Sequence, residues 1–105
     1  MIWVEFAEPA GHEPGGRRPA LVVSPIGYNR NSSYVVVCPL TTSPRPWPFK
    51  IPVPEDEPVT GFIVIDQIRA IDPNARFTVD IGQISDAVMS LVDQRLGELL
   101  ELPPA

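Results

Sequence analysis

Two apolar runs, "RPALVVSP" (18–25) and "YVVVCPL" (34–40), decide how this chain folds. Each run is rich in β-branched residues and has the length of a strand buried in a core. The segment between them, "IGYNRNSS" (26–33), has the Gly, Asn and Ser content of a turn. The sequence therefore predicts two buried strands joined by a turn, with Cys38 as a small core residue.

Four further segments predict strands around this pair. They are "IWVEF" (2–6), "FKIPV" (49–53), "GFIVIDQIRAI" (61–71) and the weaker "ARFTVDI" (75–81). Pro52 within the segment 49–53 and Pro54 directly after it have no backbone N–H to donate, so this segment is expected at a sheet edge or a strand end. The segment 7–16 contains two prolines and three glycines and is expected to be a loop.

The hydrophobic period changes near the end of the chain. From Ser85 onward apolar residues recur at spacings of three and four, at Val88, Leu91, Val92, Leu96, Leu99 and Leu100. This spacing predicts an amphipathic helix, with Ser85 as its N-cap and two prolines after its end. Six short strands and one terminal helix predict a mainly β fold, an antiparallel sheet or small barrel closed by the helix. A chain of 105 residues fits one domain, residues 1–105.

The formal net charge of −5 hides an uneven distribution of charge. Residues 14–54 contain five basic residues and no acidic one, whereas the rest of the chain contains three basic and thirteen acidic residues. Because the local field decides which ligand docks, residues 14–54 are a candidate anion-binding face on an acidic body. The alternative is a chance cluster of solvated charges.

The composition also bears on where the protein works. Cys38 is the only cysteine, so no intrachain disulfide can form, and this favours a reducing, cytoplasmic location. No window approaches 18 uninterrupted apolar residues, and the N-terminus lacks the basic region of a secretory signal. We therefore expect neither a membrane span nor secretion.

Basic and hydroxyl side chains lie beside the two predicted buried strands, 18–25 and 34–40. Arg17 and Arg18 end the loop before one predicted strand, with Arg18 at the boundary, and Thr41, Thr42 and Ser43 follow the next strand. A guanidinium offers a planar fork that matches two phosphate oxygens, and hydroxyls add donors without charge. Side chains at the boundary between a strand and a loop are held more rigidly than those within a loop. The pattern suggests a phosphate site, although polar loops of this composition also occur without a function.

Three segments resemble the MazF/PemK family of toxins in order and approximate spacing. They are "GHEPGGRRPALVVSPIGYN" (11–29), "CPLTTSPRPWPF" (38–49) and "GFIVIDQIRAID" (61–72), with "IWVEF" ahead of them. The resemblance covers about residues 2–100. It implies an SH3-like β-barrel of the CcdB/MazF type with a C-terminal helix, which agrees with the strands expected above.

The resemblance also implies a function. Members are homodimeric endoribonucleases that cleave single-stranded RNA by attack of the ribose 2′-hydroxyl on phosphorus, with no metal or cofactor. A cognate antitoxin inhibits them by folding an acidic, disordered segment across the RNA groove. The excess of positive charge in residues 14–54 suits such a segment.

The family's site residues transfer to positions in this sequence. Its catalytic Arg falls on Arg18, its catalytic Thr on Thr41, and its loop Glu on Glu13. The residues expected to bind RNA are Arg17, Thr42, Ser43, Trp47, Gln67 and Arg69. Arg18 suits stabilisation of charge on phosphorus, because a guanidinium pKa above ~12 makes it a poor base. Glu13 is then the candidate base.

Several alternatives stay open at this point. One alternative concerns Arg17, which is either a second phosphate contact or a solvated charge. Another concerns Trp47 and Phe49, which either stack on bases or pack in the core or in a dimer interface. A non-catalytic barrel of the same fold is the rival function, either a CcdB-like gyrase poison or an inactive binder of RNA or antitoxin. The gyrase poison acts through a Trp-Gly-Ile terminus, whereas this chain ends "LLELPPA". Arg18 and Thr41 favour a catalyst over an inactive binder.

Overall fold

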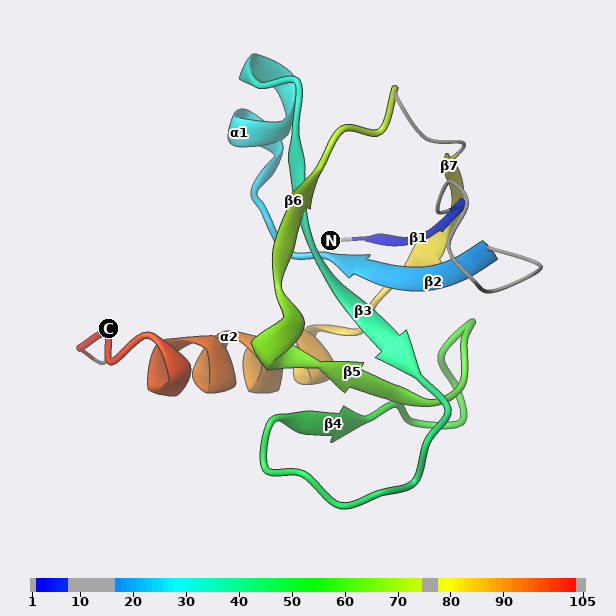
Figure 1. The fold of residues 1–105 in the computed structure, drawn as a ribbon, viewed down its shortest axis with the longest axis vertical. Helices are drawn as coiled ribbons and strands as arrows, with labels where there is room; N and C mark the ends of the chain where they lie inside the picture. Colours follow the sequence, from blue (N-terminus) through cyan, green and yellow to red (C-terminus); the bar gives the residue numbers. More distant parts are fainter. Residues whose placement is uncertain (1, 8–16, 75–77, 104–105) are drawn as a thin grey trace.

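The computed structural model describes residues 2–7, 17–74 and 78–103, and these form a mainly β fold with a C-terminal helix (Figure 1). Its elements are β1 (Ile2–Ala7), β2 (Arg17–Val22), α1 (Ile26–Asn31), β3 (Val35–Thr41), β4 (Lys50–Pro52), β5 (Phe62–Val64), the 3-10 helix η1 (Ile65–Gln67), β6 (Arg69–Ile71), β7 (Thr78–Gln83) and α2 (Asp86–Leu99). All strand pairs between these elements are antiparallel, as the sequence predicts.

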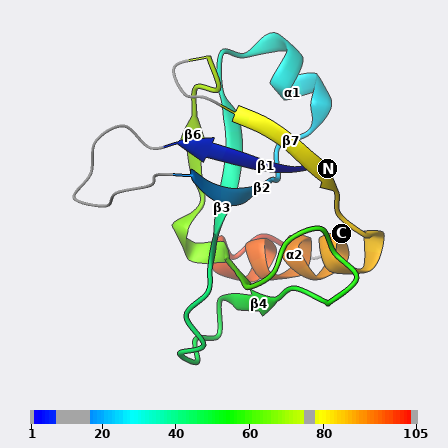
Figure 2. The same cartoon turned by 90° about the vertical axis from the view of Figure 1, so that its right-hand side faces the viewer.

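The sheet is not closed into a barrel. Its strands follow the order β4-β5-β3-β2-β1-β7, and among the described residues no pair joins β4 to β7. Figures 1 and 2 show why, since α2 lies between β4 and the group formed by β1, β2 and β7. The expected fold class is confirmed, whereas the closed SH3-like barrel is corrected to an open, curved sheet that wraps around α2.

The main core lies between α2 and this curved sheet. Its buried members come from β2, β3, β4, β5, η1, α2 and the link between β7 and α2, and they are Leu21, Cys38, Leu40, Ile51, Ile63, Ile65, Ile84, Val88 and Val92. Cys38 is fully buried, as expected, and burial raises the pKa of its thiol to about 12. A smaller cluster of Ala20, Val22, Val37 and Ile71 covers the opposite face of β2 and β3.

β3 is the central strand because it pairs with three other strands along its length. Val35 to Val37 pair with β6, Val37 to Pro39 with β2, and the last two residues, Leu40 and Thr41, with β5. β4 pairs only with β5 and forms an edge of the sheet, which confirms the position that its prolines predict.

The apolar run 61–71 predicts one strand, but the structure has two strands, β5 and β6, separated by η1. The register that pairs Val35 with Ile71 would place Asp66 opposite Leu40, yet Leu40 pairs with Ile63. Three residues are therefore looped out of the ladder, which is the length of η1. Ile65 anchors this loop, since it is fully buried and its N–H donates to the Phe49 carbonyl at 2.8 Å.

The expected turn at 26–33 contains the short helix α1. The buried Ser24 fixes α1 to the sheet, because its hydroxyl accepts the Val36 N–H at 2.9 Å and its carbonyl accepts a bond from the Asn29 side chain at 3.1 Å. Ser24 and Asn29, which both lie in the family-like segment 11–29, thus have a structural role. The predicted strand 75–81 is observed as β7, and residues 75–77 lie outside the described part.

α2 begins where the sequence predicts. Ser85 is the N-cap, and its side chain accepts the Val88 N–H at 3.4 Å. Val88 and Val92 are buried, but Leu100 lies just past the last helical residue and is 57% exposed. In the described part of the chain, no helix has the length and apolar character needed to cross a membrane.

Candidate active site

A polar cavity of about 450 Å³ lies where β3 ends. Its lining comes from β3, the segment 42–49, β4, β5 and η1, and consists of Pro39, Leu40, Thr41, Trp47, Lys50, Val64, Asp66 and Gln67. The fold thus brings together two of the segments that carry the family resemblance, 38–49 and 61–72. Three of the predicted site residues, Thr41, Trp47 and Gln67, line this cavity.

The backbone around Thr41 leaves it little freedom. Thr41 is the last residue of β3, is half-buried, and its hydroxyl oxygen accepts the Ser43 N–H at 3.2 Å. Gly61, with a φ of +124°, passes so close that a Cβ there would lie 2.6 Å from the Thr41 carbonyl oxygen. Only glycine adopts this conformation without strain and leaves room for that contact. The position of Thr41 therefore depends on its contacts with Ser43 and Gly61.

Trp47 forms one wall of the cavity with a fixed orientation. Its indole N–H donates to an Asp66 carboxylate oxygen at 3.0 Å, and its ring centroid lies 6.2 Å from that of Phe49. Trp47 is 50% exposed, whereas Phe49 is half-buried and packs against the main core. The looping out of η1 explains this contact, because it leaves Asp66 exposed and outside the ladder.

Lys50 also lines the cavity, although its sequence pattern indicates only that it belongs to the basic segment 14–54. Its ammonium donates to the carbonyls of Ser43 at 3.1 Å and Arg45 at 2.9 Å, and lies 5.8 Å from the centre of the Phe62 ring. One feature of the sequence could have drawn attention to Lys50: it is the only lysine of the chain, and it follows Phe49 in a proline-rich segment.

The remaining predicted residues lie elsewhere. Thr42 and Ser43 are exposed next to the cavity but do not form its lining, and Arg69 is exposed on β6, opposite Val37. Glu13 lies outside the described residues, and so do the side chains of Arg17 and Arg18. The backbones of both arginines belong to β2, which begins at Arg17.

The strand register relates Arg18 to the cavity. Ala20 of β2 pairs with Pro39 of β3, and continuing this antiparallel register by two residues leads from Ala20 to Arg18 and from Pro39 to Thr41. Arg18 and Thr41 therefore each lie two residues beyond the last observed pair of these neighbouring strands, Ala20 with Pro39. No cluster of three or more His, Cys, Asp or Glu residues that could hold a metal occurs in the described ranges.

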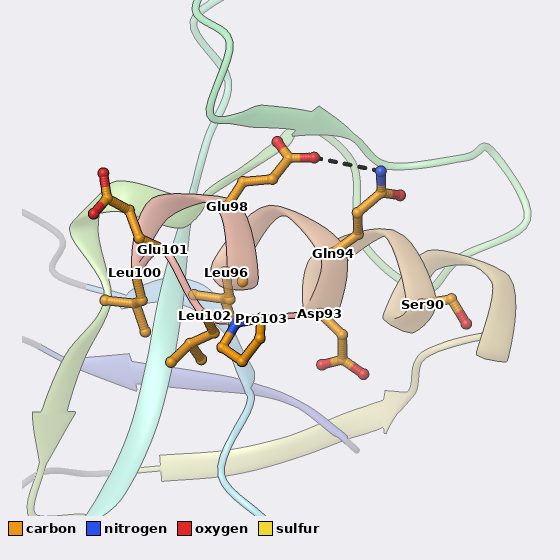
Figure 3. Close-up of a pocket in the computed structure, with 10 residues that line it drawn as sticks. Ser90, Asp93, Gln94, Leu96, Glu98, Leu100, Glu101, Leu102 and Pro103 are labelled. Carbon is orange, nitrogen blue, oxygen red and sulfur yellow. Dashed lines mark hydrogen bonds between the residues drawn. The ribbon is translucent and has the colours of Figure 1, made fainter. Parts of the chain in front are cut away.

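A second, larger cavity of about 930 Å³ lies along α2 and the residues after it (Figure 3). Its lining includes the carboxylates of Asp93, Glu98 and Glu101 and the exposed Leu100 and Leu102, and it contains no basic residue. Such a surface would repel a polyanion. The smaller cavity combines a hydroxyl, an ammonium and an exposed indole with a single carboxylate, that of Asp66, which accepts the indole N–H. It is therefore the better candidate for a site that binds nucleic acid.

The open sheet around a C-terminal helix, with this cavity at the end of its central strand, defines a small β protein suited to binding a phosphate-containing ligand. The family described as "PemK-like, MazF-like toxin of type II toxin-antitoxin system" matches residues 1–100. The chain belongs to this family.

Individual relatives agree with this assignment. The chain is 30% identical to "Endoribonuclease toxin MazF" of Escherichia coli K12 over 95% of this chain and 89% of the relative. It is 34% identical to "Endoribonuclease PemK" of Escherichia coli over 94% of this chain and 78% of the relative. A crystal structure of MazE-MazF from Deinococcus radiodurans superposes with a TM-score of 0.84 at 30% identity, covering 97% of this chain and 93% of the other.

Proposed function

We propose that this protein is an endoribonuclease that cleaves single-stranded RNA at the cavity where β3 ends. The observation that carries the proposal is that Thr41, Lys50 and Trp47 line one cavity at the end of β3, the strand that pairs with the Arg18-containing strand β2. The names of the MazF and PemK relatives support the same activity and favour it over a gyrase poison.

The chemistry is a transesterification at phosphorus. The ribose 2′-oxygen loses its proton to a base and attacks phosphorus, while the bond from phosphorus to the 5′-oxygen breaks and that oxygen takes up a proton. The products are a 2′,3′-cyclic phosphate and a 5′-hydroxyl. Arg18 stabilises the charge on the five-coordinate phosphorus, because a preformed donor fork favours the transition state over the ground state. Glu13 acts as the base.

Thr41 contributes a hydrogen bond to a phosphate oxygen. Its hydroxyl oxygen already accepts the Ser43 N–H, so its own hydrogen is available for donation to the substrate. A donor held in place before the substrate binds needs no reorganisation in the transition state. No step in this scheme draws on a metal or cofactor.

Trp47 and its neighbours bind the RNA chain. An exposed indole whose N–H is already bonded offers a ring face for stacking on an unpaired base. Thr42, Ser43, Gln67, Arg69 and Arg17 contribute polar and charged contacts around this platform. Stacking of this kind requires bases that are free of a duplex, which accounts for a preference for single strands.

A cognate antitoxin inhibits the enzyme by covering this face with an acidic segment. The basic excess of residues 14–54 supports this assignment, and so does the similarity to the MazF of the Deinococcus radiodurans MazE-MazF structure. The toxin itself is a homodimer, which covers part of the unpaired sheet edges. Light scattering at micromolar concentration should give twice the mass of one chain, and a monomer would contradict the dimer.

The activity is tested with a long RNA of mixed sequence in EDTA, followed by mapping of the fragment ends. We expect cuts at a short sequence motif, with 2′,3′-cyclic phosphate and 5′-hydroxyl ends. RNA that is bound but never cut would favour the inactive binder. Cuts that require added Mg²⁺ would leave a nuclease but contradict the scheme without a metal.

A further inference from the structure

Lys50 has no role in the scheme above, although it lies in the cavity. We propose that Lys50 is a positioning residue that holds the segment 42–46 in place and thereby orients the Thr41 hydroxyl. This inference rests on the proposed function and deepens it, because it assigns the one lysine of the chain to the reaction.

The segment after β3 cannot hold itself in place through a regular backbone ladder. It reads "TTSPRPWP" (41–48), and the prolines at positions 44, 46 and 48 have no N–H to donate. Carbonyl groups in such a segment need donors from elsewhere. Lys50 supplies them, because its ammonium donates to the carbonyls of both Ser43 and Arg45.

The position of the ammonium is itself well defined. It lies near the face of the Phe62 ring, and Lys50 is the first residue of β4, where its backbone belongs to the ladder with β5. Among the described residues it forms no ion pair with a carboxylate. The two carbonyls are therefore its main partners, and hydrogen bonds from a charged donor are stronger than those between neutral groups.

A short chain of bonds connects Lys50 to Thr41. Lys50 fixes the carbonyl of Ser43, and the N–H of the same residue donates to the Thr41 hydroxyl oxygen at 3.2 Å. The Arg45 N–H adds a bond to the Ser43 hydroxyl at 3.4 Å. If the ammonium is removed, Ser43 gains freedom and the Thr41 hydroxyl loses the contact that directs its hydrogen toward the substrate.

The first experiment compares Lys50→Met with Arg95→Met, which removes a positive charge from α2, away from the cavity. Single-turnover cleavage at saturating RNA should fall about 10- to 30-fold in Lys50→Met, with RNA affinity within about threefold of wild type and little change in its salt dependence. Arg95→Met should stay within twofold of wild type. A loss of affinity with a flattened salt slope and a normal saturated rate would instead make Lys50 a simple phosphate contact.

The second experiment restores the ammonium chemically. The thiolate of Lys50→Cys displaces bromide from 2-bromoethylamine, and the new C–S bond gives a lysine analogue of nearly the same length. Cys38 should not react, because it is fully buried and its thiol has a pKa of about 12. The unmodified variant should be as slow as Lys50→Met, and modification should restore the rate to within about threefold of wild type. Treated wild type serves as the control, and a fully modified, folded variant that stays slow would overturn the inference.

The third measurement does not depend on RNA. Amide hydrogen exchange of Ser43 should be at least tenfold faster in Lys50→Met than in wild type, while exchange in α2 stays unchanged. Equal exchange in both proteins would show that Lys50 does not hold the segment. If wild type cleaves RNA and Lys50→Met cleaves it equally fast, this inference alone fails. If wild type does not cleave RNA, the proposed function fails.

Discussion

The two cavities described above differ in charge and in how their walls are held. The cavity at the end of β3 is lined by an ammonium, a hydroxyl and an indole that are each hydrogen-bonded to a neighbouring segment, and its one carboxylate, Asp66, accepts the indole N–H. The cavity along α2 is twice as large, but carboxylates and exposed leucines form its lining. Size alone would select the second cavity, whereas charge and fixed geometry select the first for chemistry on a phosphate.

The two cavities differ because the backbone is irregular at the end of β3 and regular along α2. At the end of β3, the loss of a regular ladder around η1 and the prolines of 44–48 leave polar groups that side chains then satisfy. Each such bond also fixes a side chain that can contact a ligand. Along α2 the helix satisfies its own backbone, so its outer side chains face solvent with few constraints.

The largest effect is expected at the two arginines that begin β2. Arg18→Ala should fold and bind RNA but cleave it several hundred times more slowly, because an aimed donor to the transition state contributes about 3–4 kcal/mol. Arg17→Ala should keep most of its rate at saturating RNA and lose affinity, with a salt dependence that is lower by about one counterion. Single-turnover kinetics of both variants check this. Equal losses of rate in the two would contradict the assignment.

Gly61→Ala should strongly destabilise the wall of the first cavity. A residue with a Cβ is strained at a φ of +124° and would contact the Thr41 carbonyl, so we expect a loss of about 3 kcal/mol in the free energy of unfolding, measured in urea. Gly82→Ala is the matched control, because Gly82 has a φ of +132° but adjoins the Pro58 side chain instead. Both variants should lose stability, but only Gly61→Ala should cleave RNA more slowly per folded molecule.

Thr41→Val tests the hydroxyl with almost no change of shape. Loss of a hydrogen bond to a charged phosphate should cost about 1.5–3 kcal/mol, which is a 10- to 150-fold lower rate of cleavage. Thr42→Val is the comparison, since Thr42 is exposed and outside the cavity lining, and its rate should fall less. The same rate for Thr41→Val and wild type would remove Thr41 from the reaction.

The smallest effect is expected in the cavity along α2. Leu102→Ser changes a side chain that is 59% exposed, so the free energy of unfolding should change by no more than about 0.5 kcal/mol. RNA cleavage should stay within twofold of wild type. A marked loss of cleavage by a folded Leu102→Ser protein would show that the cavity along α2 also contributes to function. The difference in function between the two cavities would then be refuted.

Much of the fold follows from local patterns in the sequence. The burial of β2 and β3 follows from their β-branched runs, the edge position of β4 from its prolines, and the start of α2 from Ser85. These features depend on side chains close in sequence, which is why period and capping chemistry can predict them. The family resemblance added the catalytic positions of Arg18, Thr41 and Glu13, which still await a test.

Other features were decided only by the tertiary structure. The open sheet follows from the position of α2 between β4 and the far strands, and no local pattern predicts that placement. The break at η1 arises because Ile65 bonds to the carbonyl of Phe49, sixteen residues away, so that Asp66 leaves the ladder and meets Trp47. Residues 61–71 form an apolar run that predicts one strand, because period and propensity do not report contacts between distant segments. Apart from α1 and η1, the sequence by itself thus determined which segments form strands and helix and which residues are candidates for chemistry. The packing of distant segments decided which of these residues share a cavity.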